Sequence, residues 1–280
     1  MAGIQIVTDS TADMPKAVAE AYDIKVVPLS VSFGDERYQD GVDLTPEEYY
    51  RRLRREPILP RTSQPAPGQF AEVYQEAIAN GRQVLSVHIS SKLSGTYQAA
   101  SLAAEMVDKE NIKVVDTLSV SMGIGLVALA AAGHDTLSEA QKAAETAKEQ
   151  LGLFFLVDTL EYMEKNGRIG RAASLVGSLL QIKPVLTFVD GTVDVVEKVR
   201  GTRRARRRML EIFKERVGDT RIDFAVMHAD AKEEGMDLLA EVQDLVAYDK
   251  SFLGDVGPTM GSHSGPGTLG LVWRPALGSE

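Results

Sequence analysis

Short runs rich in β-branched residues alternate with segments in which apolar residues recur at helical spacing over the first half of the chain. The runs that predict strands lie at residues 4–8, 25–33, 84–90 and 112–116. The segments that predict helices lie at residues 15–22, 45–55, 69–80, 96–104, 117–133 and 138–150. Strands that alternate with helices in this way form a parallel sheet covered by helices on both faces.

The pattern changes after about residue 151. Two strand-like runs at 184–189 and 192–199 are joined by Asp190-Gly191, which is typical of a β-hairpin turn. The remaining segments predict helices at 175–180, 200–216 and 231–246, a strand at 222–228, a glycine-proline loop at 254–270 and a last strand to Trp273. We therefore predict an α/β protein of two domains: an N-terminal parallel-sheet domain at 1–156 and a C-terminal domain with a mixed or antiparallel sheet and helices at 157–280.

Composition restricts the classes of function. The chain has 280 residues, of which 44% are hydrophobic and 25% charged, values that are ordinary for a globular protein. The absence of cysteine excludes disulfides, thiolate metal ligands and a cysteine nucleophile. Four dispersed histidines have no metal-ligand spacing, so we expect neither a metal nor a cofactor.

Charge and hydropathy bear on location and partners. The net charge of −9 argues against nucleic-acid binding. The most apolar run, near residues 120–132, is shorter than the roughly 20 residues that cross a bilayer, so we expect no stable membrane insertion. The first residues enter a predicted strand without the features of a signal peptide, and we expect a cytoplasmic protein.

The segment at residues 84–98 is the strongest candidate site. It predicts a strand, a short polar turn and the start of a helix, an arrangement that favours anion binding because the first helical N–H groups lack partners. Four hydroxyl side chains, which can donate hydrogen bonds without adding charge, lie in the turn: Ser90, Ser91, Ser94 and Thr96. The alternative for Ser94 is that it only caps the helix.

Three other candidate residues lie in turns. Asp9 follows the first strand, where ligands bind in α/β sheets, and we expect it to help order the site, while Ser10 and Asp13 have the spacing of a capping box. Thr62 lies in a loop at 61–68 that two prolines make rigid. His263 lies in the glycine-proline loop, where it either binds a carboxylate or a transferred phosphoryl group or forms hydrogen bonds only with the backbone.

Residues 200–208 contain six arginines, including Arg203 and Arg204. The run is either a solvated helix surface or a docking patch for an acidic partner. If the two domains share a cleft, we expect Arg168 to lie near this patch.

Six short motifs, read together, resemble the DegV family of bacterial fatty-acid-binding proteins. They fall in the same order over nearly the whole chain, so that residues 3–279 resemble one DegV-type unit. The motifs are Thr8-Asp9-Ser10-Thr11-Ala12-Asp13, Thr62-Ser63-Gln64-Pro65, the segment 90–98, Gly167-Arg168-Ile169, Lys183-Pro184 and the segment 261–267.

The resemblance implies a carrier and not an enzyme. It would hold one long-chain, palmitate-like fatty acid non-covalently for lipid transport, with the carboxylate bound by Thr62 and Ser94. Accessory roles at this site are expected for His263, Ser91 and Asp9. Some members present the fatty acid to a separate fatty acid kinase, and Arg168, Arg203 and Arg204 would then form the docking surface.

A serine hydrolase acting on acyl esters is the alternative. Ser94 would be the nucleophile, His263 the base and Asp9 the group that orients it. The Gly-x-Ser-x-Gly turn of such enzymes is absent around Ser94. A phosphotransferase is also disfavoured, because the sequence has neither the Gly-x-x-x-x-Gly-Lys-Ser/Thr loop nor a Gly-x-Gly-x-x-Gly turn after a strand.

Overall fold

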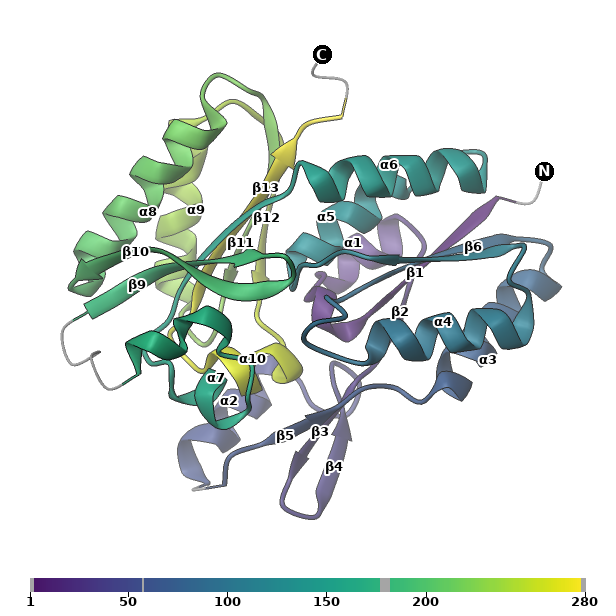
Figure 1. Ribbon diagram of the computed structural model, residues 1–280, viewed down its shortest axis with the longest axis horizontal. Helices are drawn as coiled ribbons and strands as arrows, with labels where there is room; N and C mark the ends of the chain where they lie inside the picture. Colours follow the sequence, from purple (N-terminus) through teal and green to yellow (C-terminus); the bar gives the residue numbers. More distant parts are fainter. Residues whose placement is uncertain (1–2, 57, 177–181, 278–280) are drawn as a thin grey trace.

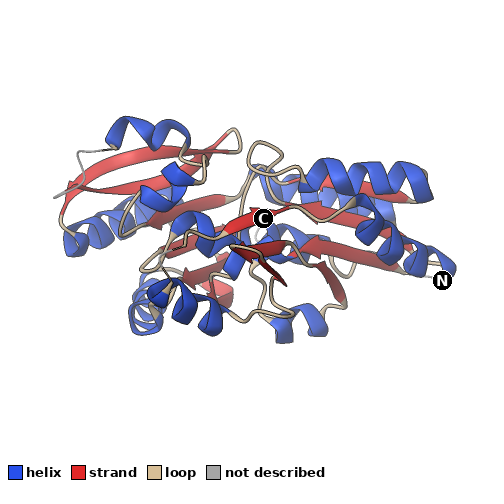
Figure 2. Ribbon diagram, turned by 90° about the horizontal axis from the view of Figure 1, so that it is seen from below, coloured by secondary structure: helices blue, strands red, loops and turns tan. Residues whose placement is uncertain are grey.

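The computed structural model describes residues 3–56, 58–176 and 182–277. Two larger sheets lie side by side, and a small third sheet lies below them (Figure 1). Seen from below, the molecule is elongated and the strands of the larger sheets run along its length (Figure 2). Among the described residues, no helix combines the length and apolar character needed to cross a membrane.

The first larger sheet has four parallel strands in the order β2-β1-β6-β7, which confirms the predicted parallel sheet. Helices α3 and α4 pack on one face, and α5 and α6 on the other. The strands are β1 Ile4–Asp9, β2 Ile24–Val27, β6 Gln83–His88 and β7 Ile112–Asp116. The helices are α1 Lys16–Ala21 beside β2, α3 Pro67–Ala79, α4 Thr96–Val107, α5 Met122–Ala131 and α6 Leu137–Glu149.

The second larger sheet has six strands in the order β10-β9-β8-β13-β11-β12 and is mixed, as predicted: only β11 and β12 pair in parallel. Helices α8 and α9 cover its outer face (Figure 1). The strands are β8 Gly152–Leu156, β9 Ile182–Val189, β10 Thr192–Arg200, β11 Ile222–His228, β12 Tyr248–Asp255 and β13 Leu269–Pro275. The helical elements are α7 Glu161–Lys165, the 3-10 turn η2 Gly170–Leu175, α8 Thr202–Val217 and α9 Lys232–Leu245.

The hairpin of β9 and β10 confirms the turn expected at Asp190-Gly191. Both residues have positive φ, 50° and 78°, as the favoured two-residue hairpin turn requires. Strand β8, which ends at residue 156, pairs with β13 and β9 in the second sheet. The division of the chain between residues 156 and 157 stays a prediction.

A small antiparallel sheet has the strand order β4-β3-β5. It lies where the sequence predicted one long strand at 25–33 and a loop at 61–68. The single strand predicted at 25–33 is wrong: it divides into β2 and β3 Ser30–Phe33, because Pro28 has no N–H with which to continue a ladder. The loop expected at 61–68 contains β5 Arg61–Ser63, and β4 spans Glu36–Gln39. Helix α2, Pro46–Arg55, begins as predicted behind Thr45, whose hydroxyl accepts from Glu48 N.

Two further local predictions are wrong. Ser10 caps no helix: it lies in a 3-10 turn, η1 Ser10–Ala12, where its Oγ accepts from Leu29 N and donates to Asp40. The loop predicted at 254–270 contains the short helix α10, Pro258–Ser264. The helix predicted at 175–180 lies largely outside the described residues.

Helix α5 joins the two halves of the fold. Every one of its residues is buried, and it contacts β1 and β6 of the first sheet and β11 and β13 of the second. It therefore belongs to a single hydrophobic core that extends from one larger sheet to the other.

Candidate functional site

A cavity of about 350 Å³ lies between the two larger sheets. Most of its wall is apolar and comes from the loop after β6, from β8 and β9, and from β11 and β13. The apolar residues that line it include Ile89, Leu93, Phe155, Phe188, Met227 and Val272. This volume lies within the range of small-molecule sites in proteins.

Thr62, Ser94 and His263, from three different segments, line the same cavity. Thr62 lies on β5 and His263 in the last turn of α10, and Thr62 Oγ1 is 2.9 Å from His263 Nε2. Ser94 precedes α4; its Oγ accepts from Thr96 N at 3.3 Å and is 2.8 Å from Thr96 Oγ1. The fold thus brings together hydroxyls that are far apart in the sequence.

His263 is neutral at pH 7. Burial, with a smaller contribution from the nearby Arg168, lowers the pKa of its imidazole to about 4. With the ring proton on Nε2, His263 donates to Thr62 and leaves the Thr62 proton free for a ligand. The buried Nδ1 of His263 and Oγ of Ser264 have no hydrogen-bond partner in the described part of the chain. This end of the cavity therefore offers uncharged polar groups.

Arg168 lies at the rim of this polar end. Its exposed side chain lines the cavity and donates to Leu93 O and Asn166 O. These bonds hold a positive charge beside the neutral donors, which favours an anion at this end.

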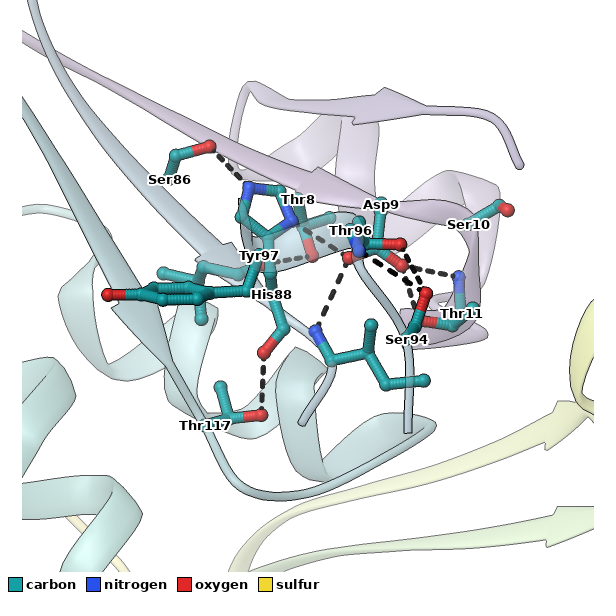
Figure 3. A network of polar contacts seen from close by, with 12 residues as sticks. Thr8, Asp9, Ser10, Thr11, Ser86, His88, Ser94, Thr96, Tyr97 and Thr117 are labelled. Atoms are coloured by element: carbon teal, nitrogen blue, oxygen red, sulfur yellow. Dashed lines mark hydrogen bonds and ion pairs between the residues drawn. The ribbon is translucent and has the colours of Figure 1, made fainter. Parts of the chain in front are cut away.

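Asp9 and Ser91 do not line the cavity. Asp9 is fully buried: Oδ2 is 2.8 Å from His88 Nδ1, and Oδ1 accepts from Thr11 N (Figure 3). Thr11 does line the cavity, so Asp9 contributes to the cavity wall only by accepting the hydrogen bond that positions Thr11. Ser91 N donates to Asp116 Oδ1.

The triad of the hydrolase alternative is not assembled. The histidine that Asp9 binds is His88, while His263 Nε2 pairs with Thr62. No hydrogen bond joins Ser94 to His263 within the described ranges. Each of the three residues of the proposed triad thus has a hydrogen-bond partner outside the triad: Thr96 for Ser94, Thr62 for His263 and His88 for Asp9.

Arg203 and Arg204 are exposed on α8, and neither has an ion-pair partner among the described residues. They do not lie beside Arg168, contrary to expectation. Helix α8 contacts β9 and shares a hydrophobic cluster with Val185, whereas η2, just after Arg168, contacts β10 and belongs with the next residue of β9, Leu186, to the other cluster. Successive strand residues point to opposite faces of a sheet, so the two groups lie on opposite sides of it.

Sequence reasoning missed several polar residues that line the cavity, among them Asp13, Ser121 and Thr259. Asp13 belongs to the same turn as Asp9, but its spacing from Ser10 indicated a helix cap. Ser121 and Thr259 follow segments with no local pattern that distinguishes a wall residue from a loop residue. In the described ranges no group of three His, Cys, Asp or Glu side chains could hold a metal ion.

Comparison with known proteins gives a consistent result. The chain matches the family model described as "Uncharacterised protein, DegV family" over residues 3–276. A DegV domain-containing protein of Streptomyces coelicolor is 38% identical over 276 residues, which are 96% of this chain and 97% of that protein.

Solved structures of similar proteins superpose over almost the full length. A fatty-acid-binding DegV family protein from Thermus thermophilus has a TM-score of 0.92 and 35% identity, and the match covers 98% of this chain and all of that one. A stearic acid-binding protein from Eubacterium ventriosum has a TM-score of 0.88 and 28% identity, with 97% of this chain and 98% of that chain covered.

Proposed function

The chain belongs to the DegV family, and from this premise we propose that it binds one long-chain fatty acid non-covalently as a carrier. The observation that supports the proposal is a cavity with a mostly apolar wall and a polar end formed by Thr62, Ser94 and His263. The alkyl tail would occupy the apolar body, and the carboxylate would bind Thr62 and Ser94.

The tail would supply most of the binding free energy. A palmitate-like chain has about 14 methylenes, each worth roughly 0.8 kcal/mol on burial, or about 11 kcal/mol in all. Lost freedom on association opposes this by about 4–15 kcal/mol. Because the two contributions are similar in size, interactions at the carboxylate decide whether the ligand stays bound and in which direction it lies.

The polar end would suit a carrier that must release its ligand. A buried carboxylate needs hydrogen-bond donors, and the hydroxyls of Thr62 and Ser94 can supply them, while the neutral imidazole of His263 donates to Thr62 and so directs the Thr62 proton to the ligand. An arginine paired directly with the carboxylate would bind it more strongly. Arg168 instead has its guanidinium bonded to two backbone carbonyls at the rim.

The direct test is extraction of the purified protein with organic solvent and mass spectrometry of the extract. We expect one long-chain fatty acid per chain. Protein stripped of lipid should then bind palmitate or stearate and should leave acyl esters intact. Ester turnover that is lost on Ser94→Ala would support the hydrolase instead.

The variants Thr62→Val and Ser94→Ala should each weaken binding of palmitate about tenfold. Each removes one hydrogen bond to a charged group, which contributes about 1.5 kcal/mol at the lower end of its usual range. Competition against a fluorescent fatty acid measures the change. Ser91→Ala is the control because it removes a hydroxyl from the same turn but outside the cavity. Equal affinities for all four proteins would contradict the assignment of Thr62 and Ser94.

We further propose that the protein presents its fatty acid to a separate kinase, which would phosphorylate the carboxylate and form an acyl phosphate. Arg203 and Arg204 are exposed and form no ion pair within the described part of the chain, which supports an acidic partner surface. Because Arg168 lies on the other side of the sheet, its contribution would be at the rim of the cavity.

The variant Arg203→Glu/Arg204→Glu should reduce acyl-phosphate formation at least tenfold with a fatty acid kinase, because like charges then face each other across the interface. Fatty-acid affinity, measured separately, should not change. Lys109→Glu/Lys142→Glu makes the same charge change on exposed residues elsewhere. If both double variants support phosphorylation equally well, these arginines are not a docking site.

A further inference from the structure

A second polar patch lies in the cavity wall, formed by Asp13, Ser121 and Thr259. The patch has its own set of contacts, and none of its hydrogen bonds in the described structure reaches Thr62, Ser94 or His263. A carrier of an unsubstituted alkyl chain has no use for such groups, because methylenes neither donate nor accept hydrogen bonds.

The carboxyl of Asp13 is fixed in position from two sides. Its Oδ1 accepts from Gly257 N at 2.9 Å, and its Oδ2 is 2.6 Å from Ser121 Oγ. Burial, with a smaller contribution from the neighbouring Asp40, raises the pKa of Asp13 well above its ordinary value. Ser121 Oγ donates to Asp13 Oδ2, so the lone pairs of its oxygen stay available to a donor in the cavity.

Thr259 adds a hydroxyl without a fixed partner. The residue is only 3% exposed, and its Oγ1 lies near Asp40 but makes no hydrogen bond of normal geometry within the described structure. Buried polar atoms are nearly always hydrogen-bonded, so an unpartnered hydroxyl in a cavity wall indicates a ligand group or a water molecule.

Ser121 has a backbone conformation that residues other than glycine rarely adopt. Its φ is 52° and its ψ is −142°. Such strain persists only where the surroundings enforce it, and it is common at binding sites. Here it sets the Ser121 hydroxyl against Asp13 at the cavity wall.

We propose that the cavity is built for a fatty acid whose chain carries an oxygen substituent, a hydroxyl or oxo group, which Asp13, Ser121 and Thr259 bind. The inference rests on the proposed function, because the carboxylate would still lie at the Thr62 end. A second carboxylate is a poor fit for this patch, since Asp13 and Asp40 would repel it. A neutral hydroxyl both donates and accepts, which matches the mixture of donors and acceptors in the wall.

The test uses protein stripped of lipid and a panel of stearic acids with a hydroxyl at carbon 2, 3, 10 or 12. Each competes with a fluorescent fatty acid, and stearate is the reference. We expect one positional isomer to bind about tenfold more tightly than stearate, equivalent to about 1.4 kcal/mol. In Ser121→Gly and Ser121→Ala, the ratio of the two affinities should fall to about one. Glycine relieves the strained backbone, so agreement between the two variants assigns the effect to the hydroxyl.

Leu118→Gly is the matched backbone control. Leu118 also has a positive φ, 51°, in the same loop but does not line the cavity, so its variant should keep the preference. The inference is overturned if no isomer binds more tightly than stearate, or if the preference survives both Ser121 variants. Failure of stearate and of every hydroxystearate to bind would instead refute the proposed function itself.

Discussion

The Gly270→Leu variant is expected to bind palmitate about two-hundredfold more weakly than the unmodified protein while it keeps its fold. Gly270 lies on β13 and lines the cavity, and a Cβ added there would meet its nearest neighbour, Met227, at 3.7 Å, an ordinary contact. The leucine side chain therefore enters open space where the tail would lie. Displacing about four methylenes at roughly 0.8 kcal/mol each removes about 3 kcal/mol of binding.

Chain length makes this experiment specific. In Gly270→Leu the affinity should shift in favour of shorter acids, so that decanoate loses much less than palmitate. Gly68→Leu is the control, since a Cβ at Gly68 meets nothing within 4 Å and the residue lies outside the cavity. Circular dichroism and thermal unfolding verify the fold. Palmitate affinity equal to that of the control would show that the tail does not lie along β13.

Asp40 is expected to make the unliganded protein less stable as pH rises from about 4 to about 6. Burial raises the pKa of Asp40 to about 6, although the backbone N–H of Thr259 and the hydroxyl of Ser10 donate hydrogen bonds to it. The unfolded chain releases the proton near the ordinary value, so the folded state binds more protons across this interval and stability falls with pH. A shift of about two units corresponds to about 3 kcal/mol.

The variant Asp40→Asn should remove that part of the slope, because the amide keeps a hydrogen-bond acceptor but does not titrate. Urea unfolding of lipid-free protein between pH 4 and 8 measures the free energy of unfolding. The exposed Asp35→Asn provides the reference for a charge change without burial. A constant difference in stability between Asp40→Asn and the unmodified protein over this pH range would contradict the assignment.

The sequence pattern predicted the elements whose residues carry a strong local signal. The parallel sheet, the hairpin at Asp190-Gly191 and helix α2 behind Thr45 carried clear periodicity or turn chemistry. Strand β12 carried neither: it lies at the edge of its sheet, and none of its residues, Tyr248–Asp255, is β-branched. Helix α10 was missed because its glycines and proline indicate a loop. Its start is held by long-range hydrogen bonds, which Gly257 N and Thr259 N donate to the carboxylates of Asp13 and Asp40.

The candidate site was predictable at its polar end and not along its wall. Thr62 and Ser94 belong to short motifs with recognisable composition, and both line the cavity with His263. No local pattern distinguishes Phe155 or Met227, which line the cavity, from core residues such as Phe154 or Val226. Their exposure to a cavity depends on how two sheets pack, which is information that no short segment contains. The cytoplasmic location and the kinase partner stay predictions.

The burial of α5 limits how this architecture can change. A helix without a solvent-exposed face must fit two sheets at once, so a substitution in α5 that packs well against one sheet must also pack against the other. Replacing either half with an unrelated domain would expose the apolar surface of α5 or of the sheet that it covers. We therefore expect the residues that face α5 from the two sheets to coevolve.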